Sequence, residues 1–212
     1  MDKCAICQSN LVLWTDEIFK CESCGLGITE NLRIQKGGYH RDETYIQEEK
    51  LFKNIFLKRV NIISKFAKQG RVLEIGCSTG IMLKLLQNRG WKVKGVEISS
   101  KAADIAKKFV IEVLVGDFHK LKFEEKFDVV ILNHTLEHLE NPTEVIKKIK
   151  NLLIPDGLLF IDVPNFGGLS ANILGKNWPL LLPSEHLWHF TEKSLRILLQ
   201  KLGFKIIFTE KA

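Results

Sequence analysis

The chain has 212 residues and a hydrophobic fraction of 45%, which suit one full globular domain with a small appendage. No apolar run is long enough to span a membrane, and the start Met1-Asp-Lys-Cys4 lacks the apolar stretch of a signal peptide. These features argue against a membrane-spanning or exported protein and predict a cytoplasmic one.

The net charge of +6 is unevenly placed along the chain. Residues 1–30 hold two basic and five acidic residues, a net −3, so the remainder carries +9. Much of the excess lies on one predicted helix, with Lys50, Lys53, Lys58, Arg59, Lys65 and Lys68. Such a face could meet nucleic acid or an acidic substrate. We favour a solvated, lysine-rich helix surface instead.

Four of the five cysteines lie in the first 24 residues, as Cys4-Ala-Ile-Cys7 and Cys21-Glu-Ser-Cys24. Paired Cys-x-x-Cys units in a reducing compartment indicate metal rather than disulfides. The apolar segments Leu11–Trp14 and Ile18-Phe19 between them suit two short strands. So small a piece cannot bury enough apolar surface alone, and a zinc held by four thiolates would supply folding energy. Residues 1–30 are therefore predicted to be a zinc ribbon, with structural zinc on Cys4, Cys7, Cys21 and Cys24.

Residues 31–70 are predicted to be a linker followed by an amphipathic helix over 43–69. From residue 71 to 212, strand and helix patterns alternate, which predicts an α/β domain with a parallel sheet covered by helices on both faces. The predicted strands are 71–75, 92–96, 111–115, 127–132, 157–163 and 204–209. The predicted helices are 80–89, 99–109, 142–151 and 191–202. The irregular stretch 164–190 is typical of a lid or substrate wall.

The candidate ligand-binding residues follow the ends of the predicted strands. The first strand runs into Gly76-Cys-Ser-Thr-Gly80, where glycines let the backbone turn tightly and approach a ligand. The second ends at Glu97, an acid that can take both hydroxyls of a ribose. The third ends at Asp117-Phe118, an acid that can accept an adenine amino group beside a ring that can cover the base. The fourth leads into Asn133-His134, and Leu153-Ile-Pro-Asp-Gly157 precedes the fifth.

This set, in this order, resembles the class I S-adenosylmethionine-dependent methyltransferases, which have a Rossmann-like sheet. Over residues 71–210 it is similar to the methyltransferase-domain family that includes the ubiquinone-biosynthesis O-methyltransferases. The cysteine ribbon and a linker with Tyr39 and Tyr45 also resemble zinc-ribbon methyltransferases that act on sugars or other small metabolites.

The resemblance implies a cofactor site for S-adenosylmethionine. Glu74, Gly76, Cys77 and Gly80 would line the methionine part, although Cys77 could equally be a small buried packing residue. Glu97 would bind the ribose, and Ile98 would pack on the adenine. Asp117 and Phe118 would fix the adenine, while Asn133 and the His134 region would close over the methionine end by main-chain contact.

Two features depart from the family pattern. Ser78 stands where glycine is usual, which narrows the conformational freedom of the turn. The chain stops at Ala212, before the family's reversed seventh strand, so we expect an open sheet edge or a shortened chain. A dinucleotide-binding turn is the alternative for the loop, but that fingerprint needs Gly-x-Gly-x-x-Gly. Gly76, Ser78 and Gly80 are spaced by two and two.

His134-Thr-Leu-Glu137-His138 matches the His-x-x-Glu-His motif of inverted zinc proteases. That motif requires one continuous helix, whereas here it starts at a strand end, so we do not favour it. A divalent metal site is a milder alternative, since some ubiquinone-pathway relatives use acids and a histidine at this turn. We favour a packing or capping role for His138 beside the helix start at Pro142.

The segment from Glu185 to Thr191 is the candidate wall of the acceptor site. His186, and next His189, could remove a proton from an oxygen or nitrogen acceptor. Alternatively, His189 and Thr191 only cap the helix over 191–202.

The predicted function is a methyltransferase acting on a small metabolite, such as a sugar or biosynthetic intermediate. An RNA methyltransferase is an alternative supported by the +9 of residues 31–212, but a phosphate-gripping ribbon should be basic, whereas this one is acidic. A non-catalytic cofactor-binding module is the third alternative. We therefore expect a small-molecule acceptor as partner, with nucleic acid not favoured and no membrane.

Overall fold

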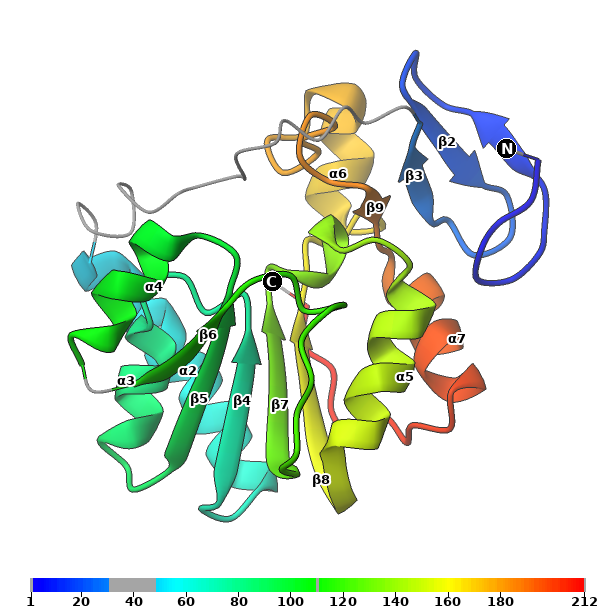
Figure 1. Cartoon of the computed structure of the whole chain (residues 1–212). Coiled ribbons are helices and arrows are strands. Elements are labelled where there is room, and N and C mark those ends of the chain that lie inside the picture. The colour runs from blue at the N-terminus through cyan, green and yellow to red at the C-terminus, as the bar shows by residue number, and fades with distance from the viewer. Residues whose placement is uncertain (1, 31–48, 110, 212) are drawn as a thin grey trace. The chain divides into compact units, whose positions relative to one another are not determined.

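The structure is a computed structural model that describes residues 2–30, 49–109 and 111–211. The chain divides into two compact units. Their helices and strands are labelled in Figure 1. The parallel-sheet unit comprises residues 36–135 and 148–162, and the ribbon unit comprises residues 1–35, 136–147 and 163–212. Within the described part of the chain, no helix is long and apolar enough to cross a membrane. Tyr39, Tyr45 and the first residues of the predicted helix 43–69 lie outside the described residues.

The parallel-sheet unit holds five strands in the order β6-β5-β4-β7-β8, and every neighbouring pair is parallel. The strands are β4 (Arg71–Ile75), β5 (Lys92–Glu97), β6 (Glu112–Val115), β7 (Phe127–Asn133) and β8 (Leu153–Asp162). The helices that begin in this unit are α2 (Glu49–Phe66), α3 (Ile81–Gln87) and α4 (Ser100–Lys107). The predicted α/β class, with a central parallel sheet flanked by helices, is confirmed.

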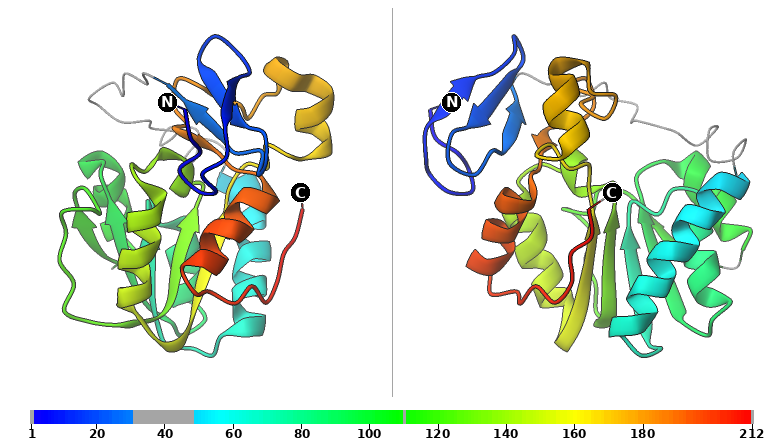
Figure 2. Two further views of the ribbon diagram at one scale, coloured as in Figure 1. Left: turned by 90° about the vertical axis from the view of Figure 1, so that its right-hand side faces the viewer. Right: turned by 180° about the vertical axis from the view of Figure 1, so that it is seen from behind.

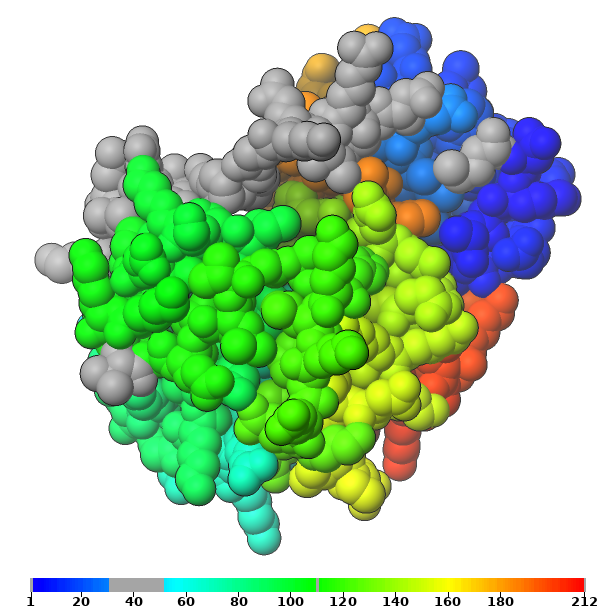
Figure 3. Space-filling view, viewed as in Figure 1, coloured from blue at the N-terminus to red at the C-terminus, as the bar shows by residue number. Residues whose placement is uncertain are grey.

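The core of this unit explains why its strands read as nearly unbroken apolar runs. A parallel sheet is covered on both faces, so residues on both sides of a strand are buried. Residues 129–132 of β7 have no exposed surface. Helix α2 lies beside α3 (Figure 2) and contributes Phe56, Val60 and Ile63 to the core shared with the sheet. In Figure 3 the segment from α4 through the loop after β6 covers one face of the unit.

The strand order reverses at β4, with β5 on one side and β7 on the other. Ligands of open parallel sheets bind outside the carboxyl ends of the strands at such a reversal. The ends of β4, β5 and β7 therefore define where this unit is expected to bind a ligand.

The ribbon unit contains an antiparallel sheet in the order β1-β2-β3-β9. Its strands are β1 (Leu11–Leu13), β2 (Ile18–Cys21), β3 (Gly27–Thr29) and β9 (Trp188–His189). The N-terminal module thus has three strands rather than the predicted two, and its fourth neighbour comes from the segment predicted to be irregular. Ile18 of β2 packs with apolar side chains of that segment, Phe166, Ala171, Trp178 and Leu181.

The remaining elements are η1 (Leu136–His138), α5 (Pro142–Leu152), α6 (Leu169–Leu174), η2 (Gly175–Asn177) and α7 (Glu192–Lys201). The stretch 164–190 is therefore not wholly irregular. The predicted strand at 204–209 is wrong, because the described residues 204–211 form no strand. Apolar alternation alone does not make a strand, since the backbone groups need a paired neighbour. Ile207 and Phe208 instead stay 53% and 47% exposed.

Candidate cofactor and acceptor sites

The loop after β4 turns through three residues with positive φ, namely Gly76 at 73°, Ser78 at 45° and Gly80 at 77°. A Cβ on Gly76 would lie 2.6 Å from the Thr135 hydroxyl oxygen, so glycine is required there. Thr135 donates a hydrogen bond to the carbonyl of Ile75 and fixes the end of β4. Ser78 adopts the left-handed conformation that glycine would take more easily, which is how the loop accommodates the departure from the family pattern.

Glu97, at the end of β5, holds this loop in place. Its Oε2 accepts a hydrogen bond from the backbone N–H of Ser78 at 2.8 Å, and its Oε1 accepts one from that of Ser99 at 2.9 Å. Ser99 in turn caps α4 by accepting from the N–H of Ala102. Each carboxylate oxygen has a further lone pair. Glu97 can therefore accept hydrogen bonds from a ligand's vicinal hydroxyls without giving up its structural bonds.

Two buried acceptors at neighbouring strand ends lack partners. Glu74 Oε2 on β4 and Asn133 Oδ1 on β7 have no hydrogen-bond partner among the described residues, and the two residues are 2% and 7% exposed. Burial raises the pKa of Glu74 to about 8, with the negative charge of Glu97 adding to the rise and Arg59 opposing it. Buried acceptors normally have donors. An ammonium group is a donor that such oxygens can accept from, and S-adenosylmethionine carries one in its amino group.

The third strand end presents Asp117, whose Oδ1 accepts from the backbone N–H of His119 at 2.9 Å. Ile98 is 66% exposed, so it presents an apolar surface that a base could cover. Phe118, by contrast, is 2% exposed and packs against Phe123, with the ring centroids 5.9 Å apart. In this conformation only the backbone of Phe118 could contact an adenine.

Lys148 on α5 supports this edge, and local sequence pattern does not indicate it because its partners lie 27 to 30 residues earlier. Its ammonium donates to the carbonyl oxygens of Phe118 at 2.6 Å, His119 at 3.1 Å and Leu121 at 2.6 Å. It also lies over the ring of Phe118, 4.6 Å from the centroid. One cation therefore fixes the loop that carries Asp117.

We expect Lys148→Met to weaken binding of S-adenosylhomocysteine by about 5- to 30-fold, since it removes hydrogen bonds to a charged group and loosens the loop at Asp117. Titration calorimetry measures the change. Lys147→Met is the matched control, because Lys147 pairs with Glu144 one turn away on the exposed side of the same helix. Equal affinities for the two variants would contradict a role for Lys148.

Arg59 lies on the helix whose basic residues the sequence predicts to be solvated, but the structure places it at the site. Its side chain is only 14% exposed, and its Nε lies 2.5 Å from Asp162 Oδ2 at the end of β8. Its second guanidinium nitrogen lies 3.1 Å from His134 Nε2. The backbone N–H of His134 donates to the carbonyl of Asp162. Arg59 thus ties together the ends of β7 and β8, and the side chain of His134 faces it.

The His-x-x-Glu-His segment does not form one helix. His134 has a φ of 49° just after β7, and only residues 136–138 form the short helix η1. The protease geometry is therefore absent. Within the ribbon unit, however, one ligand atom each of Glu137, His138 and His186 lie within 4.8 Å of one another. The rings of His138 and His186 pack edge to face, with their centroids 4.8 Å apart.

The contacts of His138 fix its tautomer. Its Nδ1 lies 3.0 Å from the carbonyl oxygen of Glu185, which can only accept, so Nδ1 carries the hydrogen. In a neutral ring Nε2 then keeps its lone pair. His138 therefore packs against the 164–190 segment, whereas the sequence favoured a contact with the helix start at Pro142.

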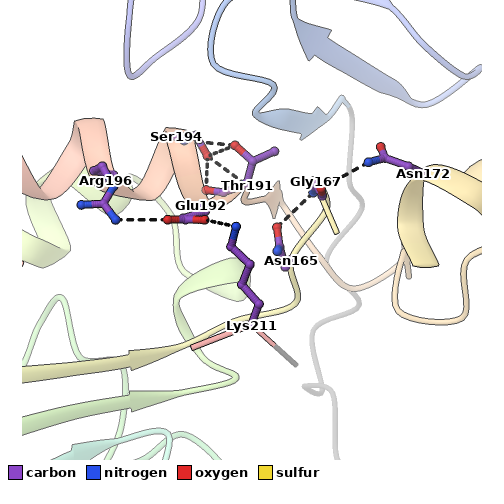
Figure 4. Close-up of polar contacts among 8 residues, drawn as sticks. All are labelled: Asn165, Gly167, Asn172, Thr191, Glu192, Ser194, Arg196 and Lys211. Carbon is purple, nitrogen blue, oxygen red and sulfur yellow. Dashed lines mark hydrogen bonds and ion pairs between the residues drawn. The ribbon is translucent and has the colours of Figure 1, made fainter. Parts of the chain in front are cut away.

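The side chain of His189 is hydrogen-bonded to Thr29 of β3. Thr29 Oγ1 donates to the carbonyl of His186 at 2.8 Å, so it accepts from His189 Nε2 at 2.9 Å. Burial lowers the pKa of His189 to about 4. Its neighbour Thr191 caps α7 in a reciprocal capping box with Ser194 (Figure 4), as predicted for this helix start. These contacts suit a neutral, structural His189.

The four N-terminal cysteines converge, and their sulfurs all lie within 4.8 Å of one another. The Cys4–Cys24 and Cys7–Cys21 sulfur distances are 3.6 and 3.4 Å. A tetrahedral zinc with Zn–S bonds of about 2.3 Å would separate its sulfurs by about 3.8 Å. Backbone N–H groups of Ile6 and Cys24 approach the sulfurs of Cys4 and Cys21 at 3.4 Å. The donor set fits a zinc ion.

The strand order, the glycine turn after β4 and the acids at the next strand ends together define the fold and cofactor edge of a class I S-adenosylmethionine-dependent methyltransferase. A family model described as "Methyltransferase domain" matches residues 47–208. The chain belongs to this methyltransferase-domain family.

Two relatives show how far the sequence similarity extends along the chain. A ubiquinone biosynthesis O-methyltransferase of Haemophilus ducreyi is 36% identical over 107 residues, which cover 45% of each chain. The chain thus spans less than half the length of the ubiquinone enzymes that it matches. An uncharacterized protein of Methanocaldococcus jannaschii is 30% identical over 159 residues, covering 72% of this chain and 73% of that protein.

Solved structures agree on the fold. A methyltransferase of Thermotoga maritima, described as a possible histamine N-methyltransferase, matches with a TM-score of 0.62 at 23% identity, covering 77% of this chain and 80% of that one. The plantazolicin methyltransferase BpumL in complex with S-adenosylhomocysteine matches with a TM-score of 0.62 at 19% identity, covering 77% and 68%. At these identities the likeness concerns the fold alone.

Proposed function

We propose that this chain is an S-adenosylmethionine-dependent methyltransferase that acts on a small metabolite, such as a sugar or a biosynthetic intermediate. The observation that carries the proposal is the pair of unpartnered acceptors, Glu74 Oε2 and Asn133 Oδ1, at the strand ends flanking the glycine turn. They can accept hydrogen bonds from a cationic donor, and Glu97 stands at the next strand end, where it can accept from hydroxyls. An adenosyl amino acid combines both groups.

In this proposal the cofactor, when bound, supplies a methyl group on a sulfonium centre. Glu74 and Asn133 hold its ammonium group, Glu97 holds the ribose hydroxyls, and Asp117 accepts from the adenine amino group. The main chain of the loop from Gly76 to Gly80 lines the methionine. Because methyl transfer is an in-line displacement, the chain contributes mainly alignment of the two reactants and a general base that accepts the acceptor's proton.

We propose that His186 is this general base, with His189 as the second candidate. The contacts of His189 disfavour it, since its Nε2 is engaged by Thr29 and burial keeps its pKa at about 4. The edge-to-face contact with His138 orients the ring of His186. A neutral histidine in this position could accept a proton from an oxygen or nitrogen acceptor.

Transfer of labelled methyl groups tests the function. The full, metal-replete chain is incubated with [methyl-³H]S-adenosylmethionine and either a small-metabolite extract or bulk RNA. We expect label in the small-molecule fraction. Label only in RNA would favour the RNA methyltransferase, and no label despite cofactor binding would favour the non-catalytic module; either outcome would overturn the proposal.

We further propose that Cys4, Cys7, Cys21 and Cys24 hold one structural zinc. Support comes from the converging sulfurs and from the backbone N–H groups of Ile6 and Cys24 that approach the sulfurs of Cys4 and Cys21. A bound dication would favour all four thiolates. The zinc would stabilise a module too small to fold on its apolar core alone.

The cluster of Glu137, His138 and His186 supports a second candidate, a divalent cation on one carboxylate and two imidazoles. These ligand types suit zinc. We expect equilibrium dialysis against excess zinc, followed by elemental analysis, to give two ions per chain for the wild type and one for His186→Ala. A single ion in both proteins would contradict the second site.

A further inference from the structure

Residues 2–30 form the cysteine module, and its third strand contacts residues 186–189, which form the histidine segment. β3 pairs with β9 in antiparallel register, with Gly27 opposite His189 and Ile28 opposite Trp188. The backbone N–H of Thr29 donates to the carbonyl of Leu187 at 3.0 Å. The module therefore supplies the backbone template on which residues 187–189 lie.

Thr29 is the side chain that extends this contact to both histidines. Its buried hydroxyl donates to the carbonyl of His186 and accepts from the ring of His189, so it fixes the backbone of one and the tautomer of the other. A side chain without the hydroxyl would remove one buried hydrogen bond from each histidine, which is costly. Close packing reinforces the pairing, since a Cβ on Gly27 would lie 2.9 Å from the Cβ of His189.

The other side of the same segment is bound to η1. The N–H of Leu187 donates to the carbonyl of Glu137 at 2.9 Å, and the indole N–H of Trp188 donates to the carbonyl of Leu139 at 2.9 Å. Residues 186–189 thus lie between β3 of the cysteine module and the short helix that carries Glu137 and His138. An ordered β3 fixes the histidine segment, and the histidine segment fixes η1.

The cysteine knuckles are bonded into the same unit through α7. Thr191 Oγ1 donates to the carbonyl of Cys24 at 2.7 Å, and Lys193 donates to the carbonyl of Ser23 at 2.5 Å. Lys201, two turns further along, donates to the carbonyl of Ile6 at 2.6 Å. Both knuckles therefore contact the helix that directly follows His189.

We propose that the cysteine module is a structural part of the acceptor site, and that Thr29 is the positioning residue through which it orders the segment with His186 and His189. This inference rests on the proposed role of His186. A metal bound by cysteines within the first 24 residues would control the geometry of His186 and His189, which lie more than 160 residues later in the sequence, so the module is not a separate appendage.

Hydrogen exchange followed by mass spectrometry on the full chain tests the inference without an acceptor. We expect Thr29→Val to raise the exchange rate of residues 186–190 about tenfold or more, as the loss of buried hydrogen bonds implies, while zinc content stays unchanged. The control is Thr209→Val, at an exposed threonine outside any helix or strand, which should exchange like the wild type. Removal of the metal with a chelator should raise exchange in residues 2–30 and in residues 186–190 together.

Unchanged protection of residues 186–190 in Thr29→Val, or their unchanged protection after the chelator has released residues 2–30, would overturn the inference. The histidine ring signals in ¹⁵N NMR give a second readout, because loss of the Thr29 acceptor should alter the His189 tautomer balance. Binding of S-adenosylhomocysteine is measured in parallel. If the wild type does not bind S-adenosylhomocysteine, the proposed function is contradicted, whereas the exchange result still decides the role of Thr29.

Discussion

Substitution of Glu74 by glutamine is expected to weaken binding of S-adenosylhomocysteine by about 10- to 100-fold, because it removes a charge-assisted hydrogen bond to the ligand's ammonium group. The pH dependence should change as well. Since burial raises the pKa of Glu74 to about 8, the free carboxyl is protonated at neutral pH and must ionise to pair with an ammonium. Wild-type affinity should therefore rise with pH up to about 8, whereas the variant should lack this rise.

The same shift has a consequence for stability, with the opposite sign. The folded state holds the Glu74 proton more tightly than the unfolded state, so this group makes unfolding easier as pH rises from the ordinary glutamate range to about 8. Glu74→Gln should thus unfold at a higher denaturant concentration than the wild type at pH 8, although it binds the ligand less well. Glu144→Gln is the control, since Glu144 is exposed and pairs with Lys147. A variant that loses both stability and affinity at pH 8 would contradict this account of Glu74.

Substitution of Cys24 by serine is expected to abolish zinc binding at the N-terminal cluster and to unfold residues 2–30. The effect should be large, because structural zinc contributes about 10–16 kcal/mol in isolated zinc-finger peptides. Elemental analysis gives the metal content, and hydrogen exchange gives the extent of unfolding. S-adenosylhomocysteine binding should persist, because the cofactor residues belong to the parallel-sheet unit.

Cys77→Ala is the matched control for this experiment. Cys77 is the one cysteine outside the cluster, it is 5% exposed, and its sulfur packs against Gly95. We expect this variant to retain zinc. Full metal retention in Cys24→Ser, or equal metal loss in both variants, would contradict the assignment of the four N-terminal cysteines.

How far the sequence predicts the structure differs between the two units. In the parallel-sheet unit, each strand carries its own buried apolar run and its own polar end residue, so local pattern was enough for β4 to β7 and for the ends at Glu74, Glu97 and Asn133. The roles of Lys148 and Arg59 cannot be predicted in this way, because they depend on partners distant in sequence. A lysine or arginine on an amphipathic helix gives the same sequence pattern whether it is solvated or hydrogen-bonded.

The ribbon unit is less predictable from local pattern. β9 has only two residues and exists because β3 offers it a partner, a pairing that spans about 160 residues of sequence. The segment 204–209 shows the reverse, since its alternation resembles a strand but the described residues find no paired neighbour. Strand pairing depends on tertiary contacts. Apolar periodicity therefore predicts strands that do not form, and misses strands that do, wherever the pairing partner is distant in sequence.

The carboxylates at the ends of β4 and β5 are proposed to bind S-adenosylmethionine. Calorimetric titration of S-adenosylhomocysteine into the full, metal-replete chain, compared with Glu97→Ala, measures this binding. We predict one site per chain for the wild type and at least about 100-fold weaker binding for the variant, since Glu97 both holds the loop at Ser78 and accepts the ribose hydroxyls. No detectable binding by the wild type, or equal binding by the two proteins, would contradict the claim.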